Sequence, residues 1–199
     1  IDRLARLIND VLDFQKLGSG KMQFNIQQHD VAEVVDDACR SMATFAEKRG
    51  VKLSIKLAED LPKAVFDSDR IIQVLTNLIN NAIKFTPKGG QVSVDVRVQG
   101  PELVFQVSDT GMGIPKEALP KIFERFYRVQ RPGKEIGGTG LGLAIVNRIV
   151  TAHGGRIEVE SELNKGTTFT VSIPLAGPPK SEPLLEGADE KIENVVVDG

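Results

Sequence analysis

"LTNLINNAIKFT", residues 75–86, has the pattern of an amphipathic helix with an unusual polar face. With about 100° between successive residues, the apolar side chains of this stretch and of the turn before it share one side. They are Ile71, Leu75, Leu78, Ile79 and Ala82. Asn77, Asn81 and Lys84 lie on the opposite side. Asparagine costs up to about 0.7 kcal/mol relative to alanine in a helix interior, and a face that only meets water normally carries Glu and Lys.

The amide and ammonium groups of this face suit a magnesium-bound polyphosphate. An amide oxygen is a hard, neutral ligand that can join phosphates and waters around Mg²⁺. A lysine supplies a positive charge that pairs with phosphate. The same residues can also form a polar surface that binds no ligand, so the spacing alone leaves both interpretations open.

Composition limits the class of protein and its partners. The chain has 199 residues, of which 41% are hydrophobic, which is enough for one globular domain with extra segments. Its formal charge of -2 creates no overall field towards nucleic acid or an anionic membrane, so we expect neither as a partner. The single cysteine, Cys39, cannot form an internal disulfide and favours a reducing, cytoplasmic compartment. No apolar run of about 18 residues exists, so we expect any membrane segment of a parent protein to lie outside this chain.

Hydrophobic periodicity predicts an α+β fold. Helices and mostly antiparallel strands are segregated, which indicates a two-layer α/β sandwich with a mixed sheet and helices on one face. The predicted helices are 31–48, about 69–85, a short one near 116–126, and about 141–153. The predicted strands are about 23–28, 51–57, the hairpin 91–98 with 102–108, and the hairpin 155–162 with 166–174.

Three segments are expected along the chain. Residues 1–21 contain a helix over the first seventeen positions whose apolar stripe is too wide for a lone helix. A partner helix, or the chain's own domain, can cover that stripe. Residues 22–176 form the main domain, and residues 177–199 form a linker with an acidic tail that we expect to be disordered.

The first glycine loop is "VSDTGMGIP", which places Asp109 at the end of a strand. Gly111 and Gly113 allow the backbone to approach a flat ligand closely. A carboxylate there accepts a hydrogen bond from the exocyclic amine of adenine and opposes the carbonyl of guanine. The alternative is an Asp-Gly turn in which Asp109 bonds its own backbone.

The second glycine loop opens the helix in "GGTGLGLAIVNRIV", with glycines at 138, 140 and 142. The free backbone N–H groups and the positive end of the helix dipole make this an anion-binding site. Neither a Rossmann fingerprint nor GxxxxGK[ST] is present, and HRD and DFG are absent, so P-loop enzymes and ordinary protein kinases are excluded. The stretch 129–136 has the composition of a mobile lid, and we expect Phe123 and Phe126 to pack beneath it. Cations that can close on phosphates are Arg125, Arg128, Arg131 and Lys134.

Five ordered motifs, "NLINNAIKFT", "DTGMGI", "FERFYR", "GGTGLGL" and "GTTF", resemble the N, G1, F, G2 and G3 boxes of sensor histidine kinases. The resemblance covers roughly residues 1–175 and implies the Bergerat ATP-binding fold shared by gyrase, heat-shock protein 90, MutL and histidine kinases. It also implies that residues 22–176 are the catalytic ATP-binding domain and that residues 1–21 end the second helix of the dimerisation and phosphoacceptor hairpin.

The resemblance implies a role for individual residues. Asn81 would coordinate Mg²⁺, and Asn77 and Lys84 would contact the phosphates of ATP. Asp109 would hold the adenine amine, and Arg128 would contact phosphate. The remaining residues of the implied nucleotide pocket and lid are Phe85, Gly111, Gly113, Ile114, Tyr127, Gly138, Thr139, Gly140, Leu141, Gly142, Leu143 and Thr168.

Asn77 separates the kinases from the hydrolases of this superfamily. The hydrolases hold a glutamate one turn before the magnesium asparagine, where it acts as general base towards water. Asn77 cannot take that proton, whereas a histidine nucleophile brings its own lone pair. We therefore expect the site to present ATP to an imidazole. The rival interpretations are a gyrase-like or heat-shock-90-like ATPase and a degenerate nucleotide-binding interaction module.

The family's phosphoacceptor motif, similar to "SHELRTPL", is absent from this chain. The two histidines are His29 and His153, and we assign neither as the acceptor. For His153, at a helix end before Gly154, a capping or dipole role is the expected one. The resemblance implies a catalytic fragment whose partners are an acceptor hairpin, in cis or in trans, and the receiver domain of a response regulator, within a homodimeric parent.

Overall fold

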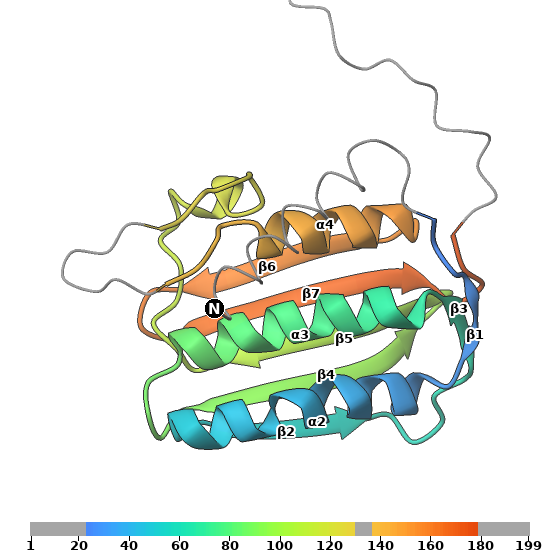
Figure 1. Ribbon diagram of the computed structural model, residues 1–199, viewed down its shortest axis with the longest axis horizontal. Helices are drawn as coiled ribbons and strands as arrows, with labels where there is room; N and C mark the ends of the chain where they lie inside the picture. Colours follow the sequence, from blue (N-terminus) through green and yellow to red (C-terminus); the bar gives the residue numbers. More distant parts are fainter. Residues whose placement is uncertain (1–22, 130–136, 179–199) are drawn as a thin grey trace, which may run out of the picture.

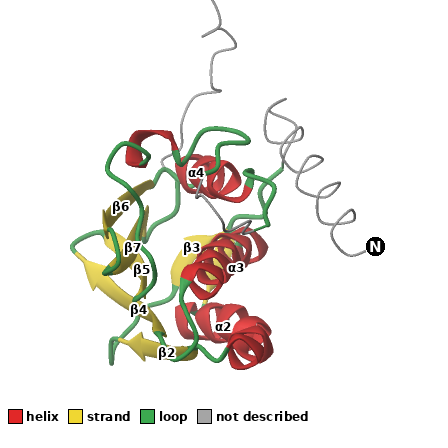
Figure 2. Ribbon diagram, turned by 90° about the vertical axis from the view of Figure 1, so that its left-hand side faces the viewer, coloured by secondary structure: helices red, strands yellow, loops and turns green. Residues whose placement is uncertain are grey.

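The computed structural model describes residues 23–129 and 137–178, and within them the chain forms two layers (Figure 1). One layer is a five-stranded sheet in the order β2-β4-β5-β7-β6, and three α-helices cover one of its faces (Figure 2). The strands are β2 (Lys52–Leu57), β4 (Gln91–Gln99), β5 (Glu102–Asp109), β6 (Arg156–Glu162) and β7 (Gly166–Pro174). The helices are α2 (Val31–Arg49), α3 (Ser68–Phe85) and α4 (Gly142–Ala152).

The sheet is mixed and mostly antiparallel, as the sequence predicts. β4 with β5, and β6 with β7, are antiparallel hairpins, and β5 pairs antiparallel with β7 between them. β2 runs parallel to β4, with Lys52 beside Gln91 and Leu57 beside Val96. A parallel pair needs a long crossover connection, and α3 lies in that connection. The predicted α+β sandwich and both hairpins are confirmed.

The apolar face of α3 forms the centre of the core. Ile71, Leu75, Leu78 and Ile79 are each 0% exposed. They belong to one cluster with inward-facing residues of the sheet: Val92, Val94, Val96, Phe105, Val107, Phe169 and Val171. Full burial of each such side chain contributes about 1.5–3 kcal/mol. This packing fixes the rotation of α3 and so fixes the direction of its amide face.

Capping residues set the ends of α2 and α3 where the sequence predicts them. Asp30 caps α2 by accepting a hydrogen bond from the Ala32 N–H at 2.9 Å, and Gly50 ends it with φ 65°. Asp67 caps α3 by accepting a hydrogen bond from the Arg70 N–H at 3.1 Å.

The structure differs from the prediction in two places. The short helix predicted near 116–126 is only a 3₁₀ turn, η1 (Leu119–Lys121), because Pro115 and Pro120 lack N–H donors. Two short strands, β1 (Gln27–His29) and β3 (Ala64–Phe66), pair into a separate small sheet. The β3 strand was not predicted, because three residues are too few to show a period of two.

Three predictions lie wholly or mostly outside the described residues. These are the helix over residues 1–17, the lid over 129–136 and the tail over 177–199. No helix in residues 23–129 and 137–178 is both long and apolar enough to cross a membrane.

Candidate nucleotide site

The amide face of α3 lies beside the start of α4. Asn77, Asn81 and Lys84 are half-buried on α3. Gly142, the first residue of α4, is so close that a Cβ added there would lie 3.4 Å from Asn77 Oδ1. A Cβ added at Gly138 would lie 2.9 Å from Lys84 Nζ. The structure therefore brings the asparagine helix and the second glycine loop together, although 61 positions separate Asn77 from Gly138 in the sequence.

The first glycine loop lies against the C-terminal end of α3. The Met112 N–H donates a hydrogen bond to the Phe85 carbonyl oxygen at 3.2 Å. A Cβ added at Gly111 would lie 2.6 Å from the same oxygen, so only glycine allows this approach. Lys84 and Phe85 follow one another here, with Lys84 Nζ 5.1 Å from the centroid of the Phe85 ring. Both glycine loops thus meet α3, one along its amide face and one at its end.

Asp109, at the end of β5, forms the turn that the sequence left as an alternative. Its Oδ1 accepts a hydrogen bond from the Gly111 N–H at 2.8 Å. Burial raises the pKa of the Asp109 carboxyl, and backbone hydrogen bonds from Gly111 and Thr167 oppose that rise. A carboxylate offers about four lone-pair sites, so these bonds leave capacity for a ligand donor. A half-buried carboxylate with a raised pKa in a cleft is a typical binding residue.

The turn between β6 and β7 holds the first glycine loop from its other side. The Ile114 N–H donates to Ser161 Oγ at 2.8 Å, and the Ser161 hydroxyl donates to the Gly166 carbonyl at 2.9 Å. The Asn164 N–H donates to the Met112 carbonyl at 2.9 Å. Gly113 has φ 66°, and a Cβ there would lie 2.1 Å from the Glu162 carbonyl oxygen. Sequence reasoning missed Ser161, because a serine on an alternating strand carries no signal of its own.

Among the described residues, the second glycine loop bonds to the turn that contains Phe126 and within itself. The Phe126 N–H donates to the Gly140 carbonyl at 2.9 Å, and Gly140 has φ 74°. Thr139 Oγ1 accepts from the Leu141 N–H at 3.1 Å, directly before α4. Leu141 itself is 0% exposed and anchors the start of the helix in the core.

Four other residues predicted for the nucleotide pocket differ in burial and in hydrogen bonding. Tyr127 and Leu143 are partly buried against the core, and Arg128 is exposed. Thr168 exchanges a hydrogen bond with Ser108 at 2.9 Å. Thr167 is the β7 residue in register with Asp109, and sequence reasoning missed it.

The prediction that Phe126 packs beneath the lid is wrong, because its side chain is 66% exposed and its backbone has φ 60°. Phe123 does pack, with its ring centroid 6.4 Å from that of Phe169 in an edge-on arrangement. The difference arises because the segment is turns instead of the predicted helix, so the helical spacing of the two rings does not hold.

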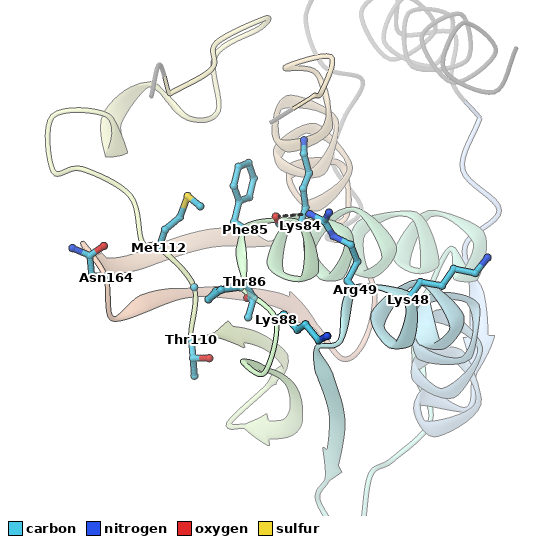
Figure 3. A pocket seen from close by; sticks show the side chains of 11 residues that line it. Lys48, Arg49, Lys84, Phe85, Thr86, Lys88, Thr110, Met112 and Asn164 are labelled. Carbon is cyan, nitrogen blue, oxygen red and sulfur yellow. Dashed lines mark hydrogen bonds between the residues drawn. The ribbon is translucent and has the colours of Figure 1, made fainter. Parts of the chain in front are cut away.

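A cavity of about 610 Å³ opens at the shared ends of α2, α3 and the first glycine loop (Figure 3). Its lining residues are Lys48, Arg49, Lys84, Phe85, Thr86, Pro87, Lys88, Thr110, Gly111, Met112 and Asn164. Four of these are cationic and none is acidic, so the cavity favours an anionic ligand. Figure 3 shows Arg49 reaching α3, where its Nη2 donates to the Lys84 carbonyl at 3.1 Å. Sequence reasoning missed Lys48 and Arg49, which the packing of α2 on α3 brings here, and Lys88, in the turn after α3.

The residues present fit a magnesium ion held with a polyphosphate. No group of three or more His, Cys, Asp or Glu side chains that could hold a metal occurs in the described part of the chain. The amide oxygens of α3 are the available donors, and such donors share Mg²⁺ with phosphate and water oxygens. Lys84 belongs both to the amide face and to the lining of the basic cavity, so a phosphate has a cationic partner beside the amide oxygens.

Comparisons with known proteins identify relatives of this chain. The sequence model of the family described as "Histidine kinase-, DNA gyrase B-, and HSP90-like ATPase" matches residues 66–177. Drug sensory protein A of Synechocystis sp. is 42% identical over 178 residues, covering 84% of this chain and 27% of that protein. Sensor histidine kinase WalK of Bacillus subtilis is 38% identical over 180 residues, covering 87% of this chain and 29% of that protein. The chain therefore spans less than a third of the length of these relatives.

A solved structure has the same fold. The crystal structure of full-length ShkA in complex with AMPPNP superposes with a TM-score of 0.78 and 33% sequence identity. The match covers 92% of this chain and 38% of that one.

Proposed function

The chain belongs to the family of histidine kinase-, DNA gyrase B- and HSP90-like ATPases as an ATP-binding catalytic domain of the sensor histidine kinase type, and from this premise we propose how its residues hold and use ATP. The observation that carries the proposal is the meeting of Asn77 and Lys84 with the second glycine loop. This meeting places neutral amide oxygens, one ammonium group and the backbone N–H groups of a helix start side by side, which are the groups that a polyphosphate needs.

The proposed pose runs from the purine to the phosphates along α3. Asp109 accepts a hydrogen bond from the adenine amine, with Phe85 and Ile114 beside the ring. Lys84, Asn77 and the N–H groups of the second glycine loop contact the phosphates. Glycines keep the two loops open to the ligand at positions 111, 113, 138, 140 and 142. The other residues of the proposed pocket are Thr139, Leu141, Leu143, Tyr127, Arg128 and Thr168.

Asn81 holds Mg²⁺ in this proposal. The ion would neutralise charge on the transferring phosphoryl group when bound. The chain's own residues contribute by fixing the triphosphate between α3 and α4 and by orienting the γ-phosphate outwards.

The proposed reaction is phosphoryl transfer to a histidine supplied from outside this chain. The imidazole lone pair forms a bond to the γ-phosphorus, the bond from that phosphorus to its bridging oxygen breaks, and ADP leaves. Asn77 stands where hydrolysis would need a general base, so water is a poor competitor. The proposed partners are the acceptor helix hairpin, a response regulator receiver domain and, in a parent protein, a second copy. We propose a cytoplasmic location for this domain.

Calorimetric titration with AMPPNP and Mg²⁺ tests the nucleotide site. We expect saturable binding, weakened when EDTA removes the metal, and a guanine analogue should bind at least about tenfold more weakly because Asp109 opposes its carbonyl. Asn81→Ala should weaken binding at least about tenfold. Asn80→Ala is the matched control, since it removes the same side chain from the same helix without touching the proposed ligands. Equal binding of the guanine analogue, or no binding at all, would contradict the proposal.

A second experiment separates the three classes of function. The chain is mixed with a separate histidine hairpin and ATP labelled at the γ-phosphate. A kinase domain puts the label on histidine, and a gyrase-like ATPase releases it as free phosphate. A degenerate binding module does neither.

A further inference from the structure

His153 ends α4 and uses both of its ring nitrogens. The side chain is 1% exposed. Nδ1 lies 2.8 Å from the Ile149 carbonyl oxygen, so Nδ1 carries the proton and donates it. Nε2 accepts a hydrogen bond from the Asp67 N–H at 3.1 Å. The first bond is an ordinary helix-end contact, but the second joins residues that are 86 positions apart.

Asp67 is the capping residue directly before α3, and it joins three segments. Its Oδ1 accepts from the Arg70 N–H at 3.1 Å and so caps α3. Its Oδ2 accepts from the Asn25 N–H at 2.8 Å, which attaches the chain before β1. Its own N–H goes to His153. The bond to His153 is buried, and the bonds from Arg70 and Asn25 are partly buried, with Asp67 itself 5% exposed.

From this pair α3 and α4 extend side by side towards the same end of the sheet, with opposite chain directions (Figure 1). Asn77 is ten residues after Asp67 on α3, and Gly142 is eleven residues before His153 on α4. At a rise of 1.5 Å per residue, both lie about 15–17 Å from the pair. This equality explains why Gly142 comes alongside Asn77, where an added Cβ would lie 3.4 Å from Asn77 Oδ1.

We propose that the His153–Asp67 hydrogen bond is a positioning contact that sets the axial register of α3 and α4, and with it the alignment of the amide face with the second glycine loop. The inference rests on the proposed function, because it assigns phosphate binding to that alignment. A helix that slides by one residue moves about 1.5 Å, which is large against the tolerance of a phosphate-binding geometry. Asp109 is on β5 and does not depend on this register.

Three substitutions separate the two hydrogen bonds of His153. His153→Gln can keep an acceptor near the position of Nε2, and His153→Asn can keep a donor near the position of Nδ1. His153→Leu keeps neither. Val150→Ala is the control, because it removes buried volume from the same helix without touching the bond, and Val150 is 0% exposed.

The readout is calorimetric affinity for AMPPNP with Mg²⁺ and, separately, for adenosine, at a temperature where circular dichroism shows each variant folded. We expect His153→Asn and His153→Leu to bind the triphosphate about tenfold more weakly, with His153→Gln and Val150→Ala within about threefold of the wild type. Adenosine affinity should stay unchanged in all four, since Asp109 holds that part.

The outcomes distinguish this inference from the proposed function. Suppose that the wild type binds AMPPNP and that the affinities of the variants follow only their melting temperatures, so that Val150→Ala binds as weakly as His153→Asn. The positioning role is then overturned. An equal loss in His153→Gln and His153→Asn overturns it as well, because the Asp67 bond would then not be the important one. If the wild type itself does not bind AMPPNP, the proposed function fails before the variants are compared.

Discussion

The two glycine loops are built differently, although both border the same helix. The first loop, residues 109–114, is tied to three distant places, namely the end of α3 through Phe85, β6 through Ser161, and the following turn through Asn164. The second loop, residues 137–141, is tied to Phe126 and to its own Thr139. The described bonds therefore tie the first loop to the sheet and to α3, and those described for the second loop run to Phe126 and within the loop itself.

This contrast suggests a division of work. A purine is flat and rigid, so a preformed slot can recognise it with little ordering on binding. A triphosphate that must be presented to an outside acceptor needs a boundary that can change shape. Substitutions of the closely packed glycines in the first loop should therefore change stability, whereas substitutions in the second loop should change mainly nucleotide binding.

The largest expected effect is that of Gly113→Ala in the first loop. Gly113 has φ 66°, and its new Cβ would lie 2.1 Å from the Glu162 carbonyl oxygen, which belongs to the backbone and cannot move aside cheaply. We expect a loss of about 3 kcal/mol or more in the free energy of unfolding, measured with urea. Gly137→Ala is the matched substitution in the second loop, where an added Cβ meets nothing within 4 Å. It should stay within about 0.5 kcal/mol of the wild type. Equal losses in the two variants would remove the contrast.

Asp109→Asn should separate stability from binding within the first loop. Burial raises the pKa of Asp109, so the folded state binds its proton more tightly than the unfolded state does. Its contribution to stability is therefore lost as pH rises through the folded pKa, and at pH 7 the ionised carboxylate opposes folding. Removing the charge should leave the nucleotide-free domain as stable as the wild type or more so. Binding of AMPPNP should weaken by about 10–100-fold, because a hydrogen bond to a charged group is lost.

The pH dependence checks the sign of this effect. Any stability gained in Asp109→Asn should shrink as pH falls through the folded pKa and vanish below the unfolded pKa, where wild-type Asp109 is protonated in both states. Asp109→Ala is the control, since it also removes the acceptor of the Gly111 N–H and should lower stability. A stability difference that grows on acidification would contradict the assignment.

Ser161→Ala should have an intermediate effect. The Ser161 hydroxyl accepts from the Ile114 N–H and donates to the Gly166 carbonyl, so alanine leaves a half-buried donor and acceptor without this partner. We expect a loss of about 1–2 kcal/mol in the free energy of unfolding. Ser161→Thr keeps the hydroxyl and serves as the control, and a full loss in both variants would place the cause in packing instead of hydrogen bonding.

Long, periodic elements of this fold could be predicted from sequence. The face of α3 is set by five apolar residues at helical spacing, and its ends are set by Asp67 and by Thr86 before Pro87, all of which are local signals. The two hairpins carry a period of two over eight or nine residues in β4, β5 and β7. Each of these patterns is long enough to outweigh individual exceptions.

What the sequence could not predict depends on contacts between distant segments. Lys48 and Arg49 reach the cavity only because α2 packs on α3, and nothing near either residue in the sequence indicates an anion site. The choice between Thr167 and Thr168 depends on strand register, because a shift of one residue moves a side chain to the other face of the sheet. The structure pairs Thr167 with Asp109 and Thr168 with Ser108, while Thr168 as a nucleotide contact stays a prediction.

The smaller of the two losses expected from removing a side-chain hydroxyl is in the second loop, at Thr139. Its Oγ1 accepts from the Leu141 N–H and orders the backbone directly before α4. Thr139→Ala removes that acceptor, and we expect a loss of about 0.5–1 kcal/mol in the free energy of unfolding, because most of α4 is held by its buried face. AMPPNP binding should weaken by several-fold, because the N–H groups proposed to contact phosphate would no longer be held in place. Thr139→Ser keeps the hydroxyl and should restore both properties. A loss of stability comparable to that of Gly113→Ala would show that the second loop is as much a part of the folded body as the first.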